Sequence, residues 1–309
     1  MKRVLLFITI IMVLLLLCSC GSGGKPKNNN VNIDEIEDHN MLDSTIDSAK
    51  QTEQMVSWHN LLIANVGESV FFGTYEQDNN TDNGQEGIEW VVLAKEDDKL
   101  LVISKYALDC QPYNTEWTDV TWENCTLREW LNDEFFQMAF SEDEQAMIPT
   151  VTIANEDTQY YYKETDLFLY YSFQEENGYE RRITDGGADT QDKVFLLSAF
   201  EAENYLDLTT NNEEERISVN PSGFCNPTIY AMNHGVYVLE QDEVENYPEL
   251  NICVGNCWWY LRSPAYDQHF VASVGVEGSV NYNGGGFAYE YAGVRPALWI
   301  DLSANTGNS

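Results

Sequence analysis

The chain ends in four short β-forming segments: Trp258-Trp-Tyr-Leu-Arg262, Phe270-Val-Ala-Ser-Val-Gly-Val276, Ser279-Val-Asn-Tyr282 and Val294-Arg-Pro-Ala-Leu-Trp-Ile-Asp-Leu302. Aromatic and β-branched residues are enriched in strands, and the glycines between these segments supply the turns. Antiparallel neighbours need only short connections, whereas parallel strands need long crossovers. The segments therefore predict an antiparallel sheet in the last part of the chain.

The preceding region adds further strands and a few helices. Strands are expected over Ser69–Tyr75, Ile88–Leu93, Leu100–Ser104 and Lys193–Leu197, and helices over 126–140, 141–147, 198–206 and 227–233. Ser141 and Ser198 each precede a glutamate by three residues, which is the spacing of a capping box at a helix start. The charged, tyrosine-rich stretch from Asn155 to Asp192 predicts a long irregular loop. Together the elements predict an α+β domain with a mainly antiparallel sheet.

The N-terminus has the pattern of an export signal. Lys2 and Arg3 precede an apolar run from Val4 to Leu17, and this run of about fourteen residues is shorter than the roughly 18–20 that cross a bilayer. The following Leu17-Cys18-Ser19-Cys20 resembles the bacterial lipobox, in which a leucine stands three residues before the cysteine that is lipidated. We therefore expect cleavage before Cys20 and a lipid on it; the alternative is an ordinary signal peptide.

These features predict how the chain is organised. The expected parts are a signal peptide (1–19), the lipidated Cys20 with a flexible tether (20–32), a helical stalk (33–64), a single α+β domain (65–303) and a C-terminal tail (304–309). The tether is rich in glycine, asparagine and lysine and has no apolar face to bury. The expected location is the extracellular face of the cell membrane, with the lipid as anchor.

The charge balance restricts the partners. The sequence has 51 acidic and 16 basic residues, a formal net charge of -35, while 43% of its residues are hydrophobic and 13% aromatic. This apolar content predicts a folded core rather than disorder. The negative charge excludes nucleic acid, which would be repelled. Neutral glycans, peptides and basic protein surfaces stay as expected extracellular ligands.

Five cysteines follow the signal, and export permits disulfides among them. They are Cys110, Cys125, Cys225, Cys253 and Cys257. Because the number is odd, at least one must stay outside an intramolecular pair. We expect Cys110 to pair with Cys125, and Cys253 to pair with Cys257 or Cys225.

Three C-terminal stretches carry a family resemblance: Asn256–Pro264, Val271–Val280 and Gly293–Ile300. They resemble the ending of an uncharacterised domain family, common in secreted and membrane-tethered proteins of Gram-positive bacteria, with Leu-Arg-Ser-Pro and Val-Arg-Pro-Ala signatures. Upstream segments such as Phe72–Tyr75 and Leu127–Asn132 keep the family's order, so the resemblance covers about residues 66–303. It implies no established activity.

The same ending is similar, at a second level, to the C-type-lectin-like fold, which includes sulfatase-modifying enzymes. In that fold ligands bind at irregular loops between the final strands, which here are Pro264–Phe270 and Asn281–Tyr291. The second loop contributes the candidate ligand-binding aromatics: Tyr282, Phe287, Tyr289 and Tyr291. Flat amphipathic rings on a glycine-rich loop suit a sugar or a partner pocket. The alternative is that these rings fold back onto the core.

Arg262 and Arg295 are two further candidates on the terminal strands. A buried guanidinium must satisfy five N–H donors. Each arginine therefore either pins the ending together through acidic side chains and carbonyl groups, or faces a ligand. Replacing either with alanine lowers thermal stability if the role is structural.

Catalytic and metal motifs are weak. Cys253 and Cys257 beside two tryptophans only superficially resemble a reactive cysteine pair, and the sequence contains no Gly-x-Ser-x-Gly or phosphate-binding loop. The histidines are isolated, so no zinc site is expected. Gln77–Gly84 and Asp185–Asp189 have the composition of calcium loops without their register, so no metal is predicted and calcium is the alternative. We expect a surface-binding domain rather than an enzyme; the alternatives are a wall-directed hydrolase and a structural display module.

Overall fold

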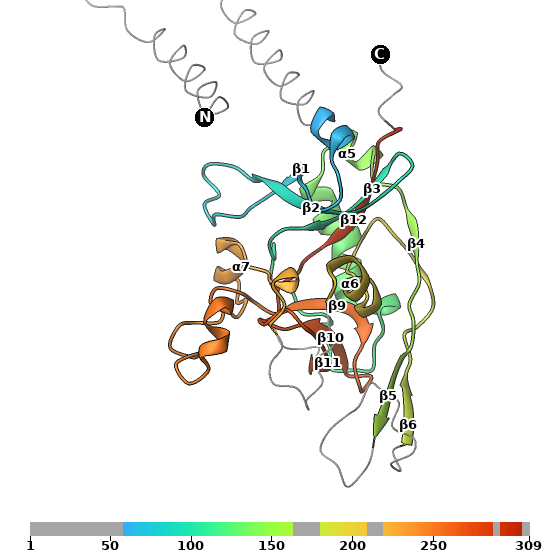
Figure 1. Ribbon diagram of the computed structural model, residues 1–309. Helices are drawn as coiled ribbons and strands as arrows, with labels where there is room; N and C mark the ends of the chain where they lie inside the picture. The colour runs from blue at the N-terminus through green and yellow to red at the C-terminus, as the bar shows by residue number, and fades with distance from the viewer. Residues whose placement is uncertain (1–57, 163–179, 209–218, 287–290, 305–309) are drawn as a thin grey trace, which may run out of the picture. The chain divides into compact units, whose positions relative to one another are not determined.

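The computed structural model describes residues 58–162, 180–208, 219–286 and 291–304 (Figure 1). The chain divides into two units, Met1–Thr52 and Glu53–Ser309, and all of the described residues lie in the second. This unit combines antiparallel sheets with short helices, which confirms the predicted α+β class.

The largest sheet joins the start of the described region to its end. Its strand order is β1 (Ser69–Tyr75), β2 (Glu86–Glu96), β3 (Lys99–Ser104), β12 (Ala297–Asp301) and β8 (Val194–Phe195). Each neighbouring pair is antiparallel. Apart from Lys99, β3 is buried along its whole length, as its unbroken apolar sequence requires of a central strand. The C-terminal strand therefore closes the core beside the N-terminal hairpins.

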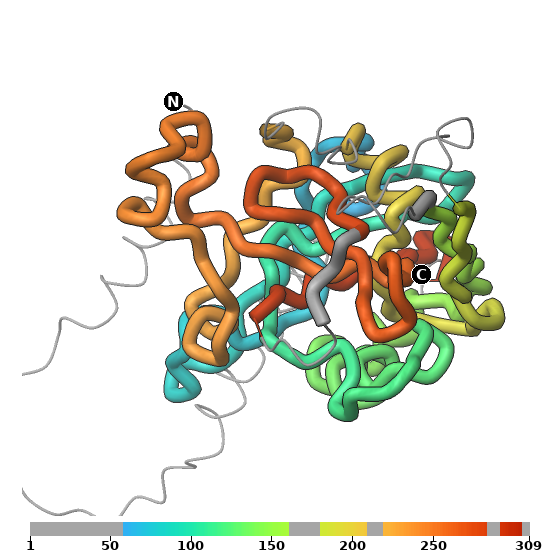
Figure 2. The backbone as a smooth tube through the Cα atoms, turned by 90° about the horizontal axis from the view of Figure 1, so that it is seen from below, coloured from blue at the N-terminus to red at the C-terminus, as the bar shows by residue number. Residues whose placement is uncertain are grey.

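A second sheet contains the other predicted terminal strands. β9 (Trp259–Pro264), β10 (Phe270–Val274) and β11 (Val280–Gly286) form a three-stranded antiparallel sheet with β10 in the centre. This sheet lies below the first one in Figure 1. Viewed from below, it lies beside the segment of η1 (Trp122–Asn124), which β9 contacts (Figure 2).

The stretch that was predicted to be one irregular loop contains strands. β4 (Val151–Ile153) pairs with β7 (Thr190–Asp192), and β5 (Thr158–Tyr162) pairs with β6 (Glu180–Thr184). The β5–β6 pair extends away from the larger sheets in Figure 1. Most of β6 is exposed on both faces, so its sequence lacks the apolar–polar alternation that would have revealed it.

Several short helical segments contact strands of the two larger sheets. Their bounds are α3 (Thr126–Trp130), the π-helical turn η2 (Leu131–Phe135), α4 (Phe136–Ala139), α5 (Glu142–Ala146), α6 (Ala199–Leu206), η4 (Pro221–Gly223), α7 (Ile229–Asn233) and η5 (Pro248–Cys253). Apolar side chains of α3, η2 and α4 recur at helical spacing and face the core, as predicted. The two predicted capping boxes are both present, at Ser141 and at Ser198.

Gly73 allows β1 to approach α4. Its φ is +71°, and a Cβ added to it would lie 2.6 Å from the carbonyl oxygen of Ala139 and from the Phe140 ring. Only glycine tolerates both conditions without strain. The pairing of β1 with β2 shifts register at this point, between Phe71 and Thr74. This irregularity in the strand therefore lets α4 and Phe140 pack closely against β1.

Candidate functional site

The loop between β9 and β10 is one of the two loops predicted to carry ligands, and it is tightly folded. The Ala265 N–H donates to the Phe270 carbonyl at 2.9 Å, and the Phe270 N–H donates to the Asp267 carbonyl at 2.9 Å. The Asp267 carboxylate accepts from the His269 N–H at 3.0 Å. These bonds fix the direction in which the loop presents Tyr266, His269 and the start of β10.

An exposed tryptophan packs against this loop from a distant part of the sequence. Trp117 stacks on His269, with ring centroids 5.8 Å apart and planes 25° apart, and meets Phe270 edge-on at 6.2 Å. Its side chain is 55% exposed. On the other side, Tyr266 stacks on Phe270 at 5.0 Å. The result is a set of adjoining aromatic rings that presents an open indole to solvent.

Two carboxylates border the rings. The His269 Nδ1 atom lies 3.0 Å from Asp119 Oδ1 and 3.0 Å from Asp267 Oδ1. The hydrogen bond from the His269 N–H lowers the pKa of Asp267, with a smaller contribution from the His269 side chain. We call Trp117, Asp119, Asp267, His269 and Phe270 the Trp117 cluster.

Gln268 fastens the Trp117 cluster to its surroundings. Its Nε2 atom donates to the Val120 carbonyl at 3.2 Å and to the Asp185 carbonyl at 3.0 Å. These contacts join the Trp117 segment, the β6–β7 connection and the β9–β10 loop. The rings are therefore held by three segments that lie far apart in the sequence.

The second predicted loop begins beside the first, because the Tyr266 N–H donates to the Tyr282 carbonyl at 3.1 Å. Tyr282 is largely buried, and burial together with the charges of Glu203 and Glu156 raises the pKa of its phenol. The next two candidates, Phe287 and Tyr289, lie outside the described residues.

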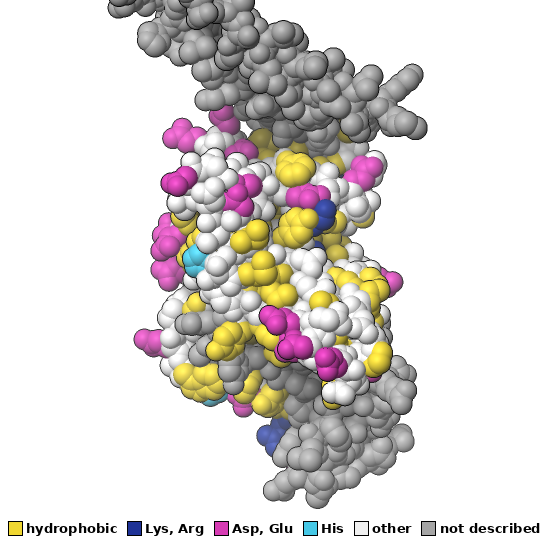
Figure 3. Space-filling model, turned by 90° about the vertical axis from the view of Figure 1, so that its left-hand side faces the viewer, with side chains coloured by type: hydrophobic (Ala, Val, Ile, Leu, Met, Phe, Trp, Pro, Cys, Tyr) yellow, Lys and Arg dark blue, Asp and Glu magenta, His cyan; other side chains and the backbone are white. Residues whose placement is uncertain are grey.

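Tyr291 belongs to another aromatic group. Its carbonyl accepts from the Tyr237 N–H at 2.9 Å, and the Tyr237 ring packs edge-on against Trp258 at 6.2 Å. Trp258 is 42% exposed and Tyr291 57%. We call Tyr237, Trp258 and Tyr291 the Trp258 cluster. The face of the molecule that carries α7 shows hydrophobic side chains along its middle, with acidic side chains both among them and at the margins (Figure 3).

Arg262 pins the ending to the rest of the domain. It is only 4% exposed, and its Nη atoms donate to both carboxylate oxygens of Glu201 on α6. They also donate to the carbonyls of Leu196 at 2.8 Å and Ala154 at 3.0 Å. Of the two predicted roles, these contacts support the structural one and not the ligand-facing one.

Arg295 is equally buried, at 4% exposure, but has a different environment. Its Nε donates to the Ser104 carbonyl at 2.8 Å, and its guanidinium lies 4.8 Å from the centre of the Trp259 ring. Within the described part of the chain it makes no ion pair, and its Nη1 atom has no hydrogen-bond partner. Its burial does not support the ligand-facing role either.

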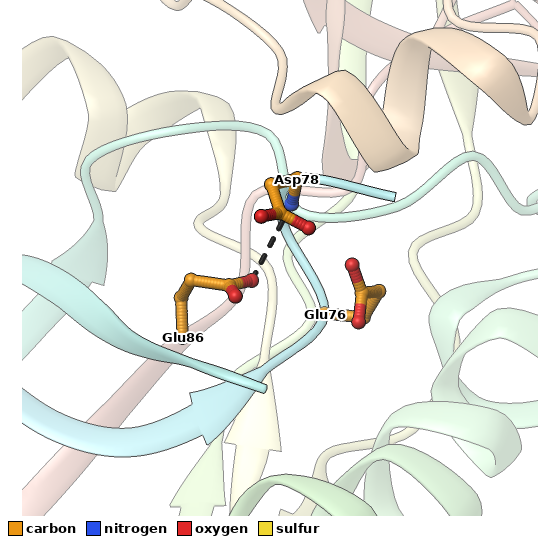
Figure 4. A group of neighbouring side chains, drawn as sticks. All are labelled: Glu76, Asp78 and Glu86. Carbon is orange, nitrogen blue, oxygen red and sulfur yellow. Dashed lines mark hydrogen bonds between the residues drawn. The ribbon is translucent and has the colours of Figure 1, made fainter. Parts of the chain in front are cut away.

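One acidic group has the composition of a metal site. Glu76, Asp78 and Glu86 lie in and beside the loop Gln77–Gly84, which has the composition but not the register of a calcium loop, with one oxygen of each within 4.8 Å of the others (Figure 4). Their oxygens already accept hydrogen bonds from the loop backbone: Glu86 from the N–H of Gln77 at 2.8 Å and of Asp78 at 3.4 Å, and Glu76 from the N–H of Asn80 at 2.9 Å. These bonds account for the turn without an ion. The other described residues bring together no comparable group of three.

The expected disulfides are not present. All five cysteines are buried and are in the thiol form. Cys125 donates to the Trp122 carbonyl at 3.6 Å instead of bonding Cys110, and burial raises its pKa to about 12. Cys253 and Cys257 cannot meet readily, because Cys253 packs in a small separate cluster with Leu239, Val244 and Val276 while Cys257 lies in the main core.

The sequence pattern missed the residues that complete the Trp117 cluster. The loop Pro264–Phe270 was predicted as a ligand loop, but Trp117 and Asp119 were not singled out. The available signal was a tryptophan within the polar stretch Asn114–Asp119, where no apolar neighbour suggests a buried position. An isolated aromatic of this kind is a weak signal, since exposed apolar residues are common.

Comparison with known proteins identifies the family of the chain but no individual relative. No curated protein and no solved structure gives a significant match. Among the described helices, none combines the length and apolarity that a membrane crossing requires. Residues 97–302, which carry β3, β8 and β12 of the largest sheet, the whole three-stranded sheet and both aromatic clusters, match the family described as a domain of unknown function, DUF6273. The chain therefore belongs to the DUF6273 domain family.

Proposed function

We propose that this protein is a lipid-anchored protein of the extracellular membrane face that binds a neutral carbohydrate at the Trp117 cluster. The exposed Trp117 indole, backed by His269 and Phe270, is the observation that carries this proposal. A sugar ring offers a flat face of C–H groups, and an aromatic ring offers a large contact area with few rotatable bonds.

The carboxylates give the proposed site its polar component. Asp119 and Asp267 stand beside the stacked rings and can accept hydrogen bonds from sugar hydroxyl groups. Binding sites for small ligands combine apolar surface with a few fixed polar groups in this way. A neutral or amino-bearing sugar fits better than an acidic one, because the chain carries a net charge of -35.

The position of the cluster also supports a relation to the C-type-lectin-like fold, which we propose as the finer fold assignment. The Trp117 cluster is built on the β9–β10 loop, between final strands of the domain. The chain ends in β12, which pairs with β3 from the start of the domain. A solved structure of a homologous domain whose chain path can be superposed on that fold would test this assignment.

The Trp258 cluster supports a second candidate function, the binding of a protein or peptide. Tyrosine and tryptophan are enriched at the energetic centres of protein interfaces. Tyr237 contacts Trp258 through its ring and Tyr291 through its backbone, and it is anchored through its hydroxyl to Glu243 at 2.7 Å. This candidate and the glycan proposal use different residues, so the same pair of variants tests both.

The decisive experiment compares Trp117→Ala with Trp258→Ala in the full chain. Wall-derived glycan fragments are screened on an array, and the affinity for the best ligand is measured by calorimetry. We expect Trp117→Ala to weaken binding about tenfold, since aromatic stacking contributes about 0.5–1.5 kcal/mol beyond area burial and 1.4 kcal/mol is about tenfold. Trp258→Ala is the matched control, an exposed tryptophan outside the cluster, and should leave glycan affinity unchanged.

Other outcomes assign the function differently. Unchanged glycan affinity in Trp117→Ala, or no glycan bound by the native chain, would overturn the proposal. Loss of a protein partner in Trp258→Ala would favour the second candidate. Shortened glycan products in the same incubations would favour the hydrolase alternative.

A further inference from the structure

Two cysteines that were not expected to pair lie side by side in the core. The N–H of Cys257, just before β9, donates to the carbonyl of Cys225 at 2.8 Å. The Cys225 thiol donates to the Asn226 carbonyl at 3.7 Å, and the two cysteine side chains are close enough for each to change the pKa of the other. A disulfide needs Cα atoms about 4.4–6.8 Å apart. The backbone hydrogen bond already holds the two residues next to each other.

Arg295 places a positive charge beside this pair. It is the buried guanidinium that has no ion pair among the described residues and an Nη1 atom without a partner. An arginine stays charged in proteins, and a buried charge needs compensation. The Trp259 ring and the Ser104 carbonyl provide part of it. A thiolate beside the guanidinium would provide the rest.

The two thiols differ in pKa beside the positive charge of Arg295. Burial alone would raise the pKa of Cys225, but the hydrogen bond from Cys257 and the charge of Arg295 outweigh it and lower that pKa. Burial, the hydrogen bond to Cys225 and the charge on Cys225 raise the pKa of Cys257. Cys225 is therefore the more acidic of the two thiols and the one that loses its proton more readily.

We propose that Cys225 and Cys257 form an intramolecular disulfide when the protein meets a disulfide-containing oxidant. Because Cys225 and Cys257 are 2% and 0% exposed, the reaction takes place when the core around them opens locally. The Cys225 thiolate then attacks one sulfur of the oxidant, forming a mixed disulfide and releasing the other sulfur as a thiolate. Cys257 then loses its proton to that thiolate and attacks the Cys225 sulfur, which releases the second oxidant thiolate. In total the two cysteines lose two electrons, and the oxidant disulfide is reduced to one thiol and one thiolate.

The remaining cysteines lack this arrangement. Cys253 packs in the separate small cluster, and the Arg295 charge acts on Cys225 and Cys257 but not on Cys125. The pairing is thus predicted to be selective. The proposal relies on export only for the natural oxidant, since the chemistry itself is independent of the proposed carbohydrate site.

The test counts and maps thiols in the full chain. The reduced protein is incubated with oxidised glutathione, quenched with acid, unfolded and alkylated, and its mass is compared with that of a reduced sample. We expect the oxidised protein to carry two fewer alkyl groups, with no glutathione retained. An unchanged number of alkyl groups after incubation to equilibrium would overturn the proposal.

Peptide mapping identifies the pair. Trypsin would leave Cys225, Cys253 and Cys257 in one fragment, because no lysine or arginine lies between Arg216 and Arg262. A glutamate-specific protease separates Cys225 from the other two at the glutamates between 240 and 249. We expect a linked pair of peptides whose fragmentation places the bond on Cys257; a bond to Cys253 would contradict the proposal.

Variants give an independent check. Cys253→Ser is the matched control and should still lose two alkyl groups, whereas Cys257→Ser should lose none. If Cys257→Ser does not fold, the map of the native chain decides alone. Arg295→Gln tests the role of Arg295 as a positioning residue: the pH profile of the oxidation rate should move to higher pH, and an unmoved profile would remove Arg295 from the mechanism.

Discussion

At the scale of single residues, the bidentate pair between Arg262 and Glu201 is a largely buried ionic contact. The Arg262 side chain is almost fully enclosed, whereas Glu201 is partly exposed. Replacing Arg262 with alanine would leave the Leu196 and Ala154 carbonyls and the Glu201 carboxylate without their donors. We expect the free energy of unfolding to fall by about 3–5 kcal/mol, the usual cost of breaking a buried pair from one side. Denaturant unfolding of the full chain measures it.

Arg182 provides the control for this prediction. It pairs with Glu180 at 2.9 Å, but both side chains are more than half exposed. Surface pairs of this kind contribute about 0–1 kcal/mol, so Arg182→Ala should change stability by less than about 1 kcal/mol. If Arg262→Ala and Arg182→Ala lowered the free energy of unfolding by equally small amounts, Arg262 would not have the structural role. Its ligand-facing role would then be favoured.

At the scale of elements, each capping box has a second function. Glu201 accepts from the Ser198 N–H at 2.9 Å at the start of α6 and also holds Arg262 of β9. Glu144 accepts from the Ser141 N–H at 2.9 Å at the start of α5 and also from the Gly73 N–H of β1 at 3.0 Å. Each helix start is therefore joined to a different sheet by the same carboxylate that caps it.

This double role predicts unequal effects within one capping box. Ser198→Ala should lower the free energy of unfolding by about 1 kcal/mol, because it removes only the cap. Glu201→Ala should cost more, since it also leaves Arg262 buried without its anion. In a double-mutant cycle Glu201→Ala and Arg262→Ala should be clearly non-additive, whereas Ser141→Ala and Arg262→Ala should add. Additive effects for the first pair would contradict the coupling of α6 to β9.

The contrast between local caps and long-range contacts also explains which features of this protein could be predicted from its sequence. Ser69–Tyr75 was predicted and found as a strand, and the Ser141 and Ser198 capping boxes were also confirmed, because their signals are local. The second partners of Glu144 and Glu201, the Cys225–Cys257 contact and the stacking of Trp117 on His269 join residues far apart in the chain. No periodic pattern records such contacts.

At the scale of the whole molecule, anchoring and charge set the conditions under which a surface site works. The whole chain carries a net charge of -35, so it should be repelled from anionic surfaces. The proposed lipid anchor and tether would confine the domain near the membrane and raise its effective concentration for ligands held there. A shallow aromatic site such as the Trp117 cluster, which binds weakly, would then suffice for retention of a wall component.

The proposed lipid anchor is assigned to Cys20, and Cys18 offers a matched control for testing it. More than one acyl chain, at about 0.8 kcal/mol for each buried methylene, would hold the protein stably on the membrane. Cys20→Ala should therefore abolish labelling by a fatty-acid analogue and leave the chain either unprocessed or released into the medium. Cys18→Ala is the matched control, because it removes a cysteine from the expected signal peptide and leaves Leu17 three residues before Cys20. It should keep both the label and the membrane fraction, and a label that persisted in Cys20→Ala would show that the lipid is elsewhere.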